Sequence, residues 1–354
     1  MQHIVASGCS FTANYKPNTQ HLNKTDEAWK LDTVENYTWF QWLWKIYKER
    51  KIDAKFHNYA AITNDNKTIC RSIFYKVNDL VFNENVNPKD ITVLIQWTAL
   101  TRNSWFISNK NYNHHNSCLT QYIHTGNCLP HTNDFIQWKS KENVYQYGYF
   151  YLSGGYYSPT NNPDNMQEFA VQYVNSVLSK EERYMEWFDS MIGLFSYLRE
   201  LGVTKIKTFQ MNNNFSSNYI DGIRTEPFYT NKDVYNNIIN KKTIFNTWDS
   251  DIEIYKNPYV KMFADRIDFN KYFWFFEEEN LHKYGGIIEW SIRNFNESLE
   301  DGGYNLPKVL WRELNNLTEN QQMEYLNTYW YGHSSSILTK KFVEDVVLKW
   351  DIFE

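Results

Sequence analysis

Asp90–Trp97, with the sequence DITVLIQW, is the stretch that decides the fold class of this chain. It is a nearly continuous apolar run, which is typical of a parallel strand buried on both faces. His3–Ala6 is a shorter apolar run of the same kind, and Ala54–Ala60 and Thr204–Gln210 are two further expected strands. The chain therefore has the strands for a buried parallel sheet.

Segments with apolar residues at helical spacing alternate with these strands. They are Thr33–Arg50, Asp65–Val81, Ser179–Leu201 and Leu338–Trp350. Asp65 is placed to cap the helix that it begins. Strands alternating with helices predict an α/β fold with a doubly wound, mainly parallel sheet and right-handed crossovers.

We expect one domain over residues 1–354, because the chain shows no internal repeat and no low-complexity linker. Two long insertions rich in aromatic residues and Asn are expected at about 103–178 and 211–330. Asn103–Asn165 shows little periodicity, and Val260–Glu279 and Gly285–Trp290 are expected to be irregular aromatic segments.

Composition excludes several classes of protein. The net charge of −5, without a long basic run, argues against nucleic acid as a partner. The N-terminus lacks the pattern of a signal peptide, and no apolar run has the length of a membrane span. We therefore expect a cytoplasmic protein, or a virion protein if a phage encodes the chain. The 18% of aromatic residues fits either core and loop packing or a sugar-binding cleft.

No metal or cofactor site is expected. The cysteines show no CxxC pair and are interpreted as reduced thiols, although Cys118 and Cys128 could pair. The adjacent His114 and His115 lack the spacing of zinc ligands, and no glycine-rich nucleotide loop occurs. The other cysteines are Cys9 and Cys70, and the other histidines of this region are His124 and His131.

Ser10 is the candidate nucleophile, within the turn Gly8-Cys9-Ser10-Phe11-Thr12 that follows the first strand. A glycine permits the sharp turn that exposes a serine hydroxyl, and backbone N–H groups after it can hold an oxyanion. Sites in such sheets form at the carboxyl ends of the strands, which also places Thr98 there.

Three short segments resemble the conserved blocks of the SGNH (GDSL-type) hydrolases. Val5–Thr12 resembles block I in a Gly-Cys-Ser form known from phage-type members, with the nucleophile at Ser10. Asn58–Asn66 resembles block II, with Thr63 at the position of the oxyanion-hole glycine. Ile95–Thr98 resembles block III, with Thr98 at the position of the oxyanion-hole asparagine. The resemblance implies a flavodoxin-like, three-layer α/β/α fold.

The same resemblance implies a general base near the C-terminus. His333 stands before the last helix, where the family has Asp-x-x-His-Pro, and Trp330 stands at the aspartate position. A Ser10–His333 dyad would therefore need a backbone carbonyl or another group to orient the imidazole. Arg102 follows the Trp-Thr pair as in phage-type relatives, or else forms a structural salt bridge. Candidate substrate-binding residues are Asn64, Trp97, Arg102 and Trp330.

Two functions follow from the resemblance. The first is a serine esterase without metal or cofactor that removes O-acyl groups from a carbohydrate or lipid. In it, Ser10 attacks, His333 transfers the proton, and the N–H of Ser10, Thr63 and Thr98 form the oxyanion hole. The second is a catalytically degenerate protein on the same fold, either a phage virion component or a glycan-binding module. Homo-oligomers or assembly into a virion are the expected associations.

Overall fold

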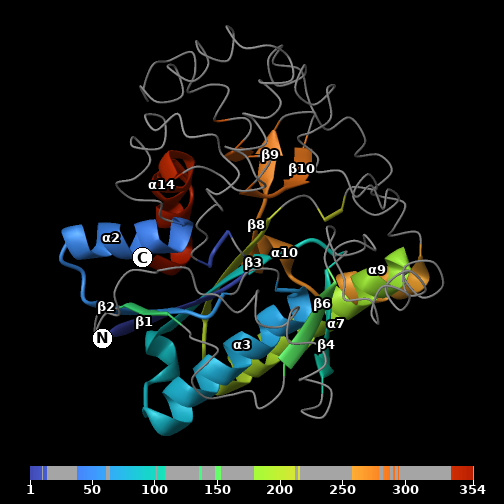
Figure 1. The fold of residues 1–354 in the computed structure, drawn as a ribbon, viewed down its shortest axis with the longest axis horizontal. Helices are drawn as coiled ribbons and strands as arrows, with labels where there is room; N and C mark the ends of the chain where they lie inside the picture. Colours follow the sequence, from blue (N-terminus) through green and yellow to red (C-terminus); the bar gives the residue numbers. More distant parts are fainter. Residues whose placement is uncertain are drawn as a thin grey trace, which may run out of the picture.

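The computed structural model describes fourteen stretches of the chain (Figure 1). These are residues 1–9, 11–13, 38–60, 64–100, 102–107, 135–137, 148–152, 179–211, 214–215, 257–278, 282–287, 290–291, 294 and 336–353. The strands and helices that position the candidate site lie within these stretches.

A six-stranded parallel sheet forms the centre of the fold. Every pair of neighbouring strands runs parallel. Without the edge strand β5, the order is 2-1-3-4-5 in chain order, which is the flavodoxin-like arrangement. The predicted doubly wound, mainly parallel α/β fold is confirmed. In spatial order the strands are β5 (Phe135–Gln137), β2 (Ala54–Asn58), β1 (Gln2–Ser7), β3 (Ile91–Trp97), β7 (Lys205–Gln210) and β8 (Phe273–Trp274).

Helices cover both faces of the sheet (Figure 1). Leu94 of β3 joins the core cluster of one face, whereas its neighbours Val93 and Ile95 join the cluster of the other. This alternation is expected because successive side chains of a strand point to opposite faces. The first face carries α2 (Trp39–Glu49) and α14 (Ser336–Asp345), and the second carries α3 (Asn66–Asn78) and α7 (Lys180–Leu201).

Side chains at the helix ends explain where α3 and α7 begin and end. Asp65 accepts a hydrogen bond from the N–H of Thr68 at 2.8 Å, so the predicted cap is confirmed. Ser179 accepts one from the N–H of Glu182 at 3.0 Å. Gly202 ends α7 with a φ of 93°, a left-handed conformation that favours glycine.

Short helical segments complete the fold. The predicted helix up to Val81 continues beyond α3 as a π-helical turn, and the predicted C-terminal helix changes to 3₁₀ turns after Asp345. None of the helices in the described stretches has the length and apolar character needed to cross a membrane. The segments are α9 (Pro258–Ala264), α10 (Phe269–Tyr272), η2 (Asp79–Asn83), η3 (Pro88–Asp90), η9 (Val347–Lys349) and η10 (Asp351–Phe353).

The expectation of irregular structure in two regions is wrong for their described parts. Within Asn103–Asn165, β5 extends the main sheet, and β4 (Asn103–Ile107) pairs antiparallel with β6 (Gly148–Leu152). The region from Val260 supplies α9, α10 and β8, followed by an antiparallel pair, β9 (Phe276–Glu278) and β10 (His282–Gly285). Strands of two to five residues are too short to show a period in the sequence.

Candidate functional site

The turn after β1 is the centre of the candidate site. The N–H groups of Thr12 and Ala13 both donate to the carbonyl of Cys9, at 2.9 and 2.8 Å. Cys9 and Phe11 are buried in the core layer below α2 and α14. Ser10 lies outside the described residues, but the residues on both sides of it form a tight turn at the carboxyl end of a strand.

The side chain of Gln96 on β3 anchors this turn through hydrogen bonds. Its Oε1 accepts from the N–H of Cys9 at 3.2 Å, from the Cys9 thiol at 3.3 Å and from the Thr12 hydroxyl at 3.2 Å. Its Nε2 donates to the carbonyl of Trp97 at 2.6 Å. The Gln96 side chain is fully buried. A buried amide with all these partners fixes the turn because no water competes for them.

Gly8 permits the close approach of the turn to β3. A Cβ at this position would lie 2.5 Å from the Thr12 hydroxyl and 2.8 Å from Oε1 of Gln96. The carbonyl of Gly8 accepts a hydrogen bond from Nδ2 of Asn64 at 3.1 Å. Asn64 was predicted to bind substrate, and in the structure this buried side chain contacts the turn after β1.

The end of β2 and the start of α2 hold the other side of the turn. Asn58 donates from Nδ2 to the carbonyl of Thr12 at 2.9 Å, and Thr38 donates from its hydroxyl to the same carbonyl at 3.2 Å. The indole N–H of Trp39 donates to the Thr12 hydroxyl at 2.9 Å. Residues from β2, β3 and α2 therefore fix the turn together.

Thr98 is held by two amide side chains, one from the first residue of α3 and one from Asn214. Asn66 accepts from the N–H of Thr98 at 2.9 Å and donates to its carbonyl at 3.2 Å. Asn214 donates to the same carbonyl at 2.9 Å. The side chain of Thr98 is fully buried, and its hydroxyl lies 4.0 Å from the sulfur of Met211. The Thr98 N–H is occupied, so the predicted oxyanion role rests on this hydroxyl alone.

Trp97 is a core residue in the structure. Its side chain is 0% exposed and makes an edge-to-face contact with Trp187 of α7, at 6.2 Å between ring centroids. The carboxyl edge of β3 presents the backbone of Trp97 rather than its ring, because the ring points toward α7. The Trp97 side chain has no exposed surface with which it could make the expected contact to a substrate.

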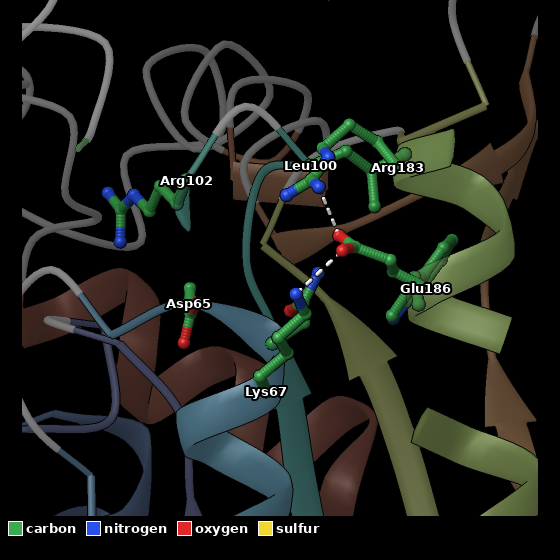
Figure 2. Close-up of a pocket in the computed structure, with 8 residues that line it drawn as sticks. Asp65, Lys67, Leu100, Arg102, Arg183 and Glu186 are labelled. Carbon is green, nitrogen blue, oxygen red and sulfur yellow. Dashed lines mark hydrogen bonds and ion pairs between the residues drawn. The ribbon is translucent and has the colours of Figure 1, made fainter. Parts of the chain in front are cut away.

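Arg102 lines a pocket beside the loop after β3 (Figure 2). On the far side of this pocket, Glu186 pairs with Lys67 at 2.7 Å and with Arg183. Arg102 forms no ion pair with any residue that the structure describes, and its Nη1 is buried without a hydrogen-bond partner there. Its interpretation as a structural salt bridge therefore finds no support in the described part. The pocket has a cavity volume of only about 20 Å³ and is also lined by Asp65, Asn66, Leu100 and Trp187.

Four predicted site residues lie outside the described stretches, namely Ser10, Thr63, Trp330 and His333. Leu338, five residues after His333, belongs to the same core cluster as Cys9 and Phe11. The described start of α14 and the described turn after β1 are therefore parts of one layer of the fold.

Gly286 lies in Gly285–Trp290, which was expected to be an irregular aromatic segment, and it packs closely against β7. A Cβ at Gly286 would lie 2.3 Å from the carbonyl oxygen of Gln210, at the carboxyl end of β7. This close backbone approach brings Ile287 and Trp290 into the core between the sheet and α14.

Cys9 and Cys70 are free, and burial raises the pKa of the Cys70 thiol. Within the described stretches, no three His, Cys, Asp or Glu side chains gather in a way that could hold a metal ion. Cys118 and Cys128, which were expected to be either reduced thiols or a disulfide pair, lie outside these stretches.

Sequence reasoning missed the amides that position the loops, which are Asn58, Asn66, Gln96 and Asn214. The available signal was a polar residue where a buried strand should be apolar, as at Gln96 within DITVLIQW. Buried polar groups occur where they have hydrogen-bond partners, so such a residue indicates a partner across the sheet.

No family model matches this chain, and no curated protein and no solved structure matches it either. The sheet order and the site geometry therefore carry the functional argument by themselves.

Proposed function

We propose that this chain is a serine acyl hydrolase of the SGNH type that removes O-acyl groups from a carbohydrate or lipid. One observation carries the proposal: the turn that contains Ser10 follows β1, and buried hydrogen bonds hold it at the carboxyl edge of the sheet. In the order 2-1-3, this edge between β1 and β3 is the topological switch point, where open α/β sheets bind their ligands.

The proposed chemistry begins with attack of the Ser10 hydroxyl on the ester carbonyl. His333 accepts the serine proton and then donates it to the leaving alcohol, and water hydrolyses the acyl-serine with the same base. The N–H of Ser10, the loop at Thr63 and the hydroxyl of Thr98 stabilise the oxyanion. The rigid turn supports this scheme because preorganised donors need no rearrangement during the reaction.

The substitution Ser10→Ala tests the proposal. We expect it to abolish hydrolysis of p-nitrophenyl acetate and labelling by a fluorophosphonate probe, without a change in the midpoint of thermal unfolding. Ser190→Ala is the matched control, because the Ser190 hydroxyl lies on α7 and donates to the carbonyl of Glu186 at 2.7 Å. Full turnover by the Ser10→Ala variant would refute the proposal.

The role of His333 has a separate readout. His333→Ala should lower kcat by a factor of at least about 10³, as the loss of a general base does in serine enzymes, and should leave residual probe labelling at high pH. Wild-type protein that is silent toward both ester and probe, but binds glycans or assembles into oligomers, would favour the second function, a degenerate protein on this fold.

A further inference from the structure

A second pocket lies between α7 and α10, away from the candidate active site. It has a cavity volume of about 90 Å³ and is lined by Ile192, Phe195, Ser196, Arg199, Arg266, Ile267, Asp268, Lys271 and Tyr272. Arg183, which lines the pocket in Figure 2, and Arg199 both lie on α7. The two pockets share no lining residue, so they are distinct.

The charge of this second pocket is positive. Arg199 comes from α7, whereas Arg266 and Lys271 come from the segment that joins α9 to β8. Asp268 is the acidic residue of the lining, and its carboxylate already accepts the N–H of Lys271 at 3.0 Å. Three cations and one carboxylate leave two positive charges, which matches the charge of a phosphate monoester near neutral pH.

The lining also contains a buried tyrosine. Tyr272 is 4% exposed, and its hydroxyl oxygen is itself buried, so a ligand in the open pocket meets the ring rather than the hydroxyl. Neither Arg266 nor Lys271 forms an ion pair with another residue of the described stretches. The ammonium of Lys271 lies over the Tyr272 ring, 5.3 Å from its centroid.

Apolar groups form the rest of the pocket. The ring of Tyr272 stacks on that of Phe195, with 4.5 Å between centroids and 27° between planes. Ile192 and Ile267 line the same space. Pockets for small molecules commonly combine such apolar walls with a few polar groups that fix the ligand.

We propose that this pocket binds a small organic phosphate, with the phosphate held by Arg199, Arg266 and Lys271 and the hydrophobic part of the ligand against Phe195 and the two isoleucines. The proposal is independent of the acyl hydrolase function, because none of these residues contributes to the turn at Ser10.

Isothermal titration calorimetry with phenyl phosphate as the probe tests the proposal on the full chain. We expect binding that weakens with salt, and at least about tenfold weaker binding for Arg266→Ala and for Lys271→Ala, the loss expected for one hydrogen bond to a charged group. Lys261→Ala is the matched control, because Lys261 is an exposed lysine of α9 that pairs with Asp265 and does not line the pocket.

Three results would overturn the proposal. The first is no binding of phenyl phosphate at millimolar concentration. The second is unchanged affinity in the Arg266→Ala and Lys271→Ala variants. The third is equal affinity for phenyl phosphate and phenylacetate, which would assign the pocket to a carboxylate. Inorganic phosphate that binds as tightly as phenyl phosphate would refute the role of the apolar wall.

Discussion

We expect acid to destabilise this protein through a buried pair of histidines on neighbouring strands. Nδ1 of His3 on β1 lies 3.1 Å from Nε2 of His57 on β2, and the two rings are stacked with 5.3 Å between centroids. The His57 side chain is fully buried, and its Nδ1 has no partner among the described residues. Burial lowers the pKa of His57 from 6.5 to about 2, and the positive charges of Lys76 and Lys55 act in the same direction.

The lowered pKa of His57 determines how the stability of the fold changes with pH. The unfolded chain binds a proton at His57 below pH 6.5, whereas the folded chain stays neutral there until about pH 2. This contribution to stability is therefore complete above pH 6.5 and decreases as the pH falls toward 2. Between pH 7 and pH 5, one such histidine lowers the free energy of unfolding by about 1.9 kcal/mol, at 1.36 kcal/mol per proton and pH unit. His3, whose pKa is also lowered by burial, acts in the same direction.

Urea unfolding at pH 7 and at pH 5 measures this effect in the wild type and in His57→Gln. We expect the loss of stability between the two pH values to be smaller by about 2 kcal/mol in the variant. Ile73→Val is the control, because it removes a methyl group from the same core layer without changing a titrating group. An equal loss at low pH in wild type and His57→Gln would refute the reasoning.

Four further substitutions test the packing around the sheet edge and α7. Gln96→Leu should lower the free energy of unfolding by about 2–4 kcal/mol in urea titrations, because it leaves buried donors without an acceptor; a loss below about 1 kcal/mol would contradict this. Gly286→Ala should destabilise the protein by at least about 2 kcal/mol in thermal unfolding, because the added Cβ would meet backbone atoms. Gly193→Ala on α7 should instead stabilise it by about 0.5–1 kcal/mol, because a Cβ at this position has nothing within 4 Å. Equal effects of the two substitutions would exclude the close approach at Gly286. Ser179→Ala should cost about 1 kcal/mol through the lost cap of α7, and an unchanged unfolding midpoint would show that this cap is dispensable.

Tertiary hydrogen bonds position the loops of the candidate site, and the sequence showed few of the residues that form them. Asn64 and Thr98 were predicted from their places after β2 and β3, and both lie at the carboxyl edge. The hydrogen bonds of Asn66 and Gln96, however, join residues more than 30 positions apart in the chain. No local pattern specifies a partner at that distance, so these positioning residues became visible only in the structure.

The sequence by itself determined the regular elements of the scaffold. β1, β2, β3 and β7, and the helices α2, α3, α7 and α14, follow from apolar runs and helical spacing, since burial on a sheet face requires that pattern in the chain. Only the tertiary structure decided the edge strands β5 and β8, because two or three residues form a strand only when a neighbouring strand supplies the hydrogen bonds. It also decided that the ring of Trp97 belongs to the core, since the face toward which a strand residue points depends on which helix covers that face.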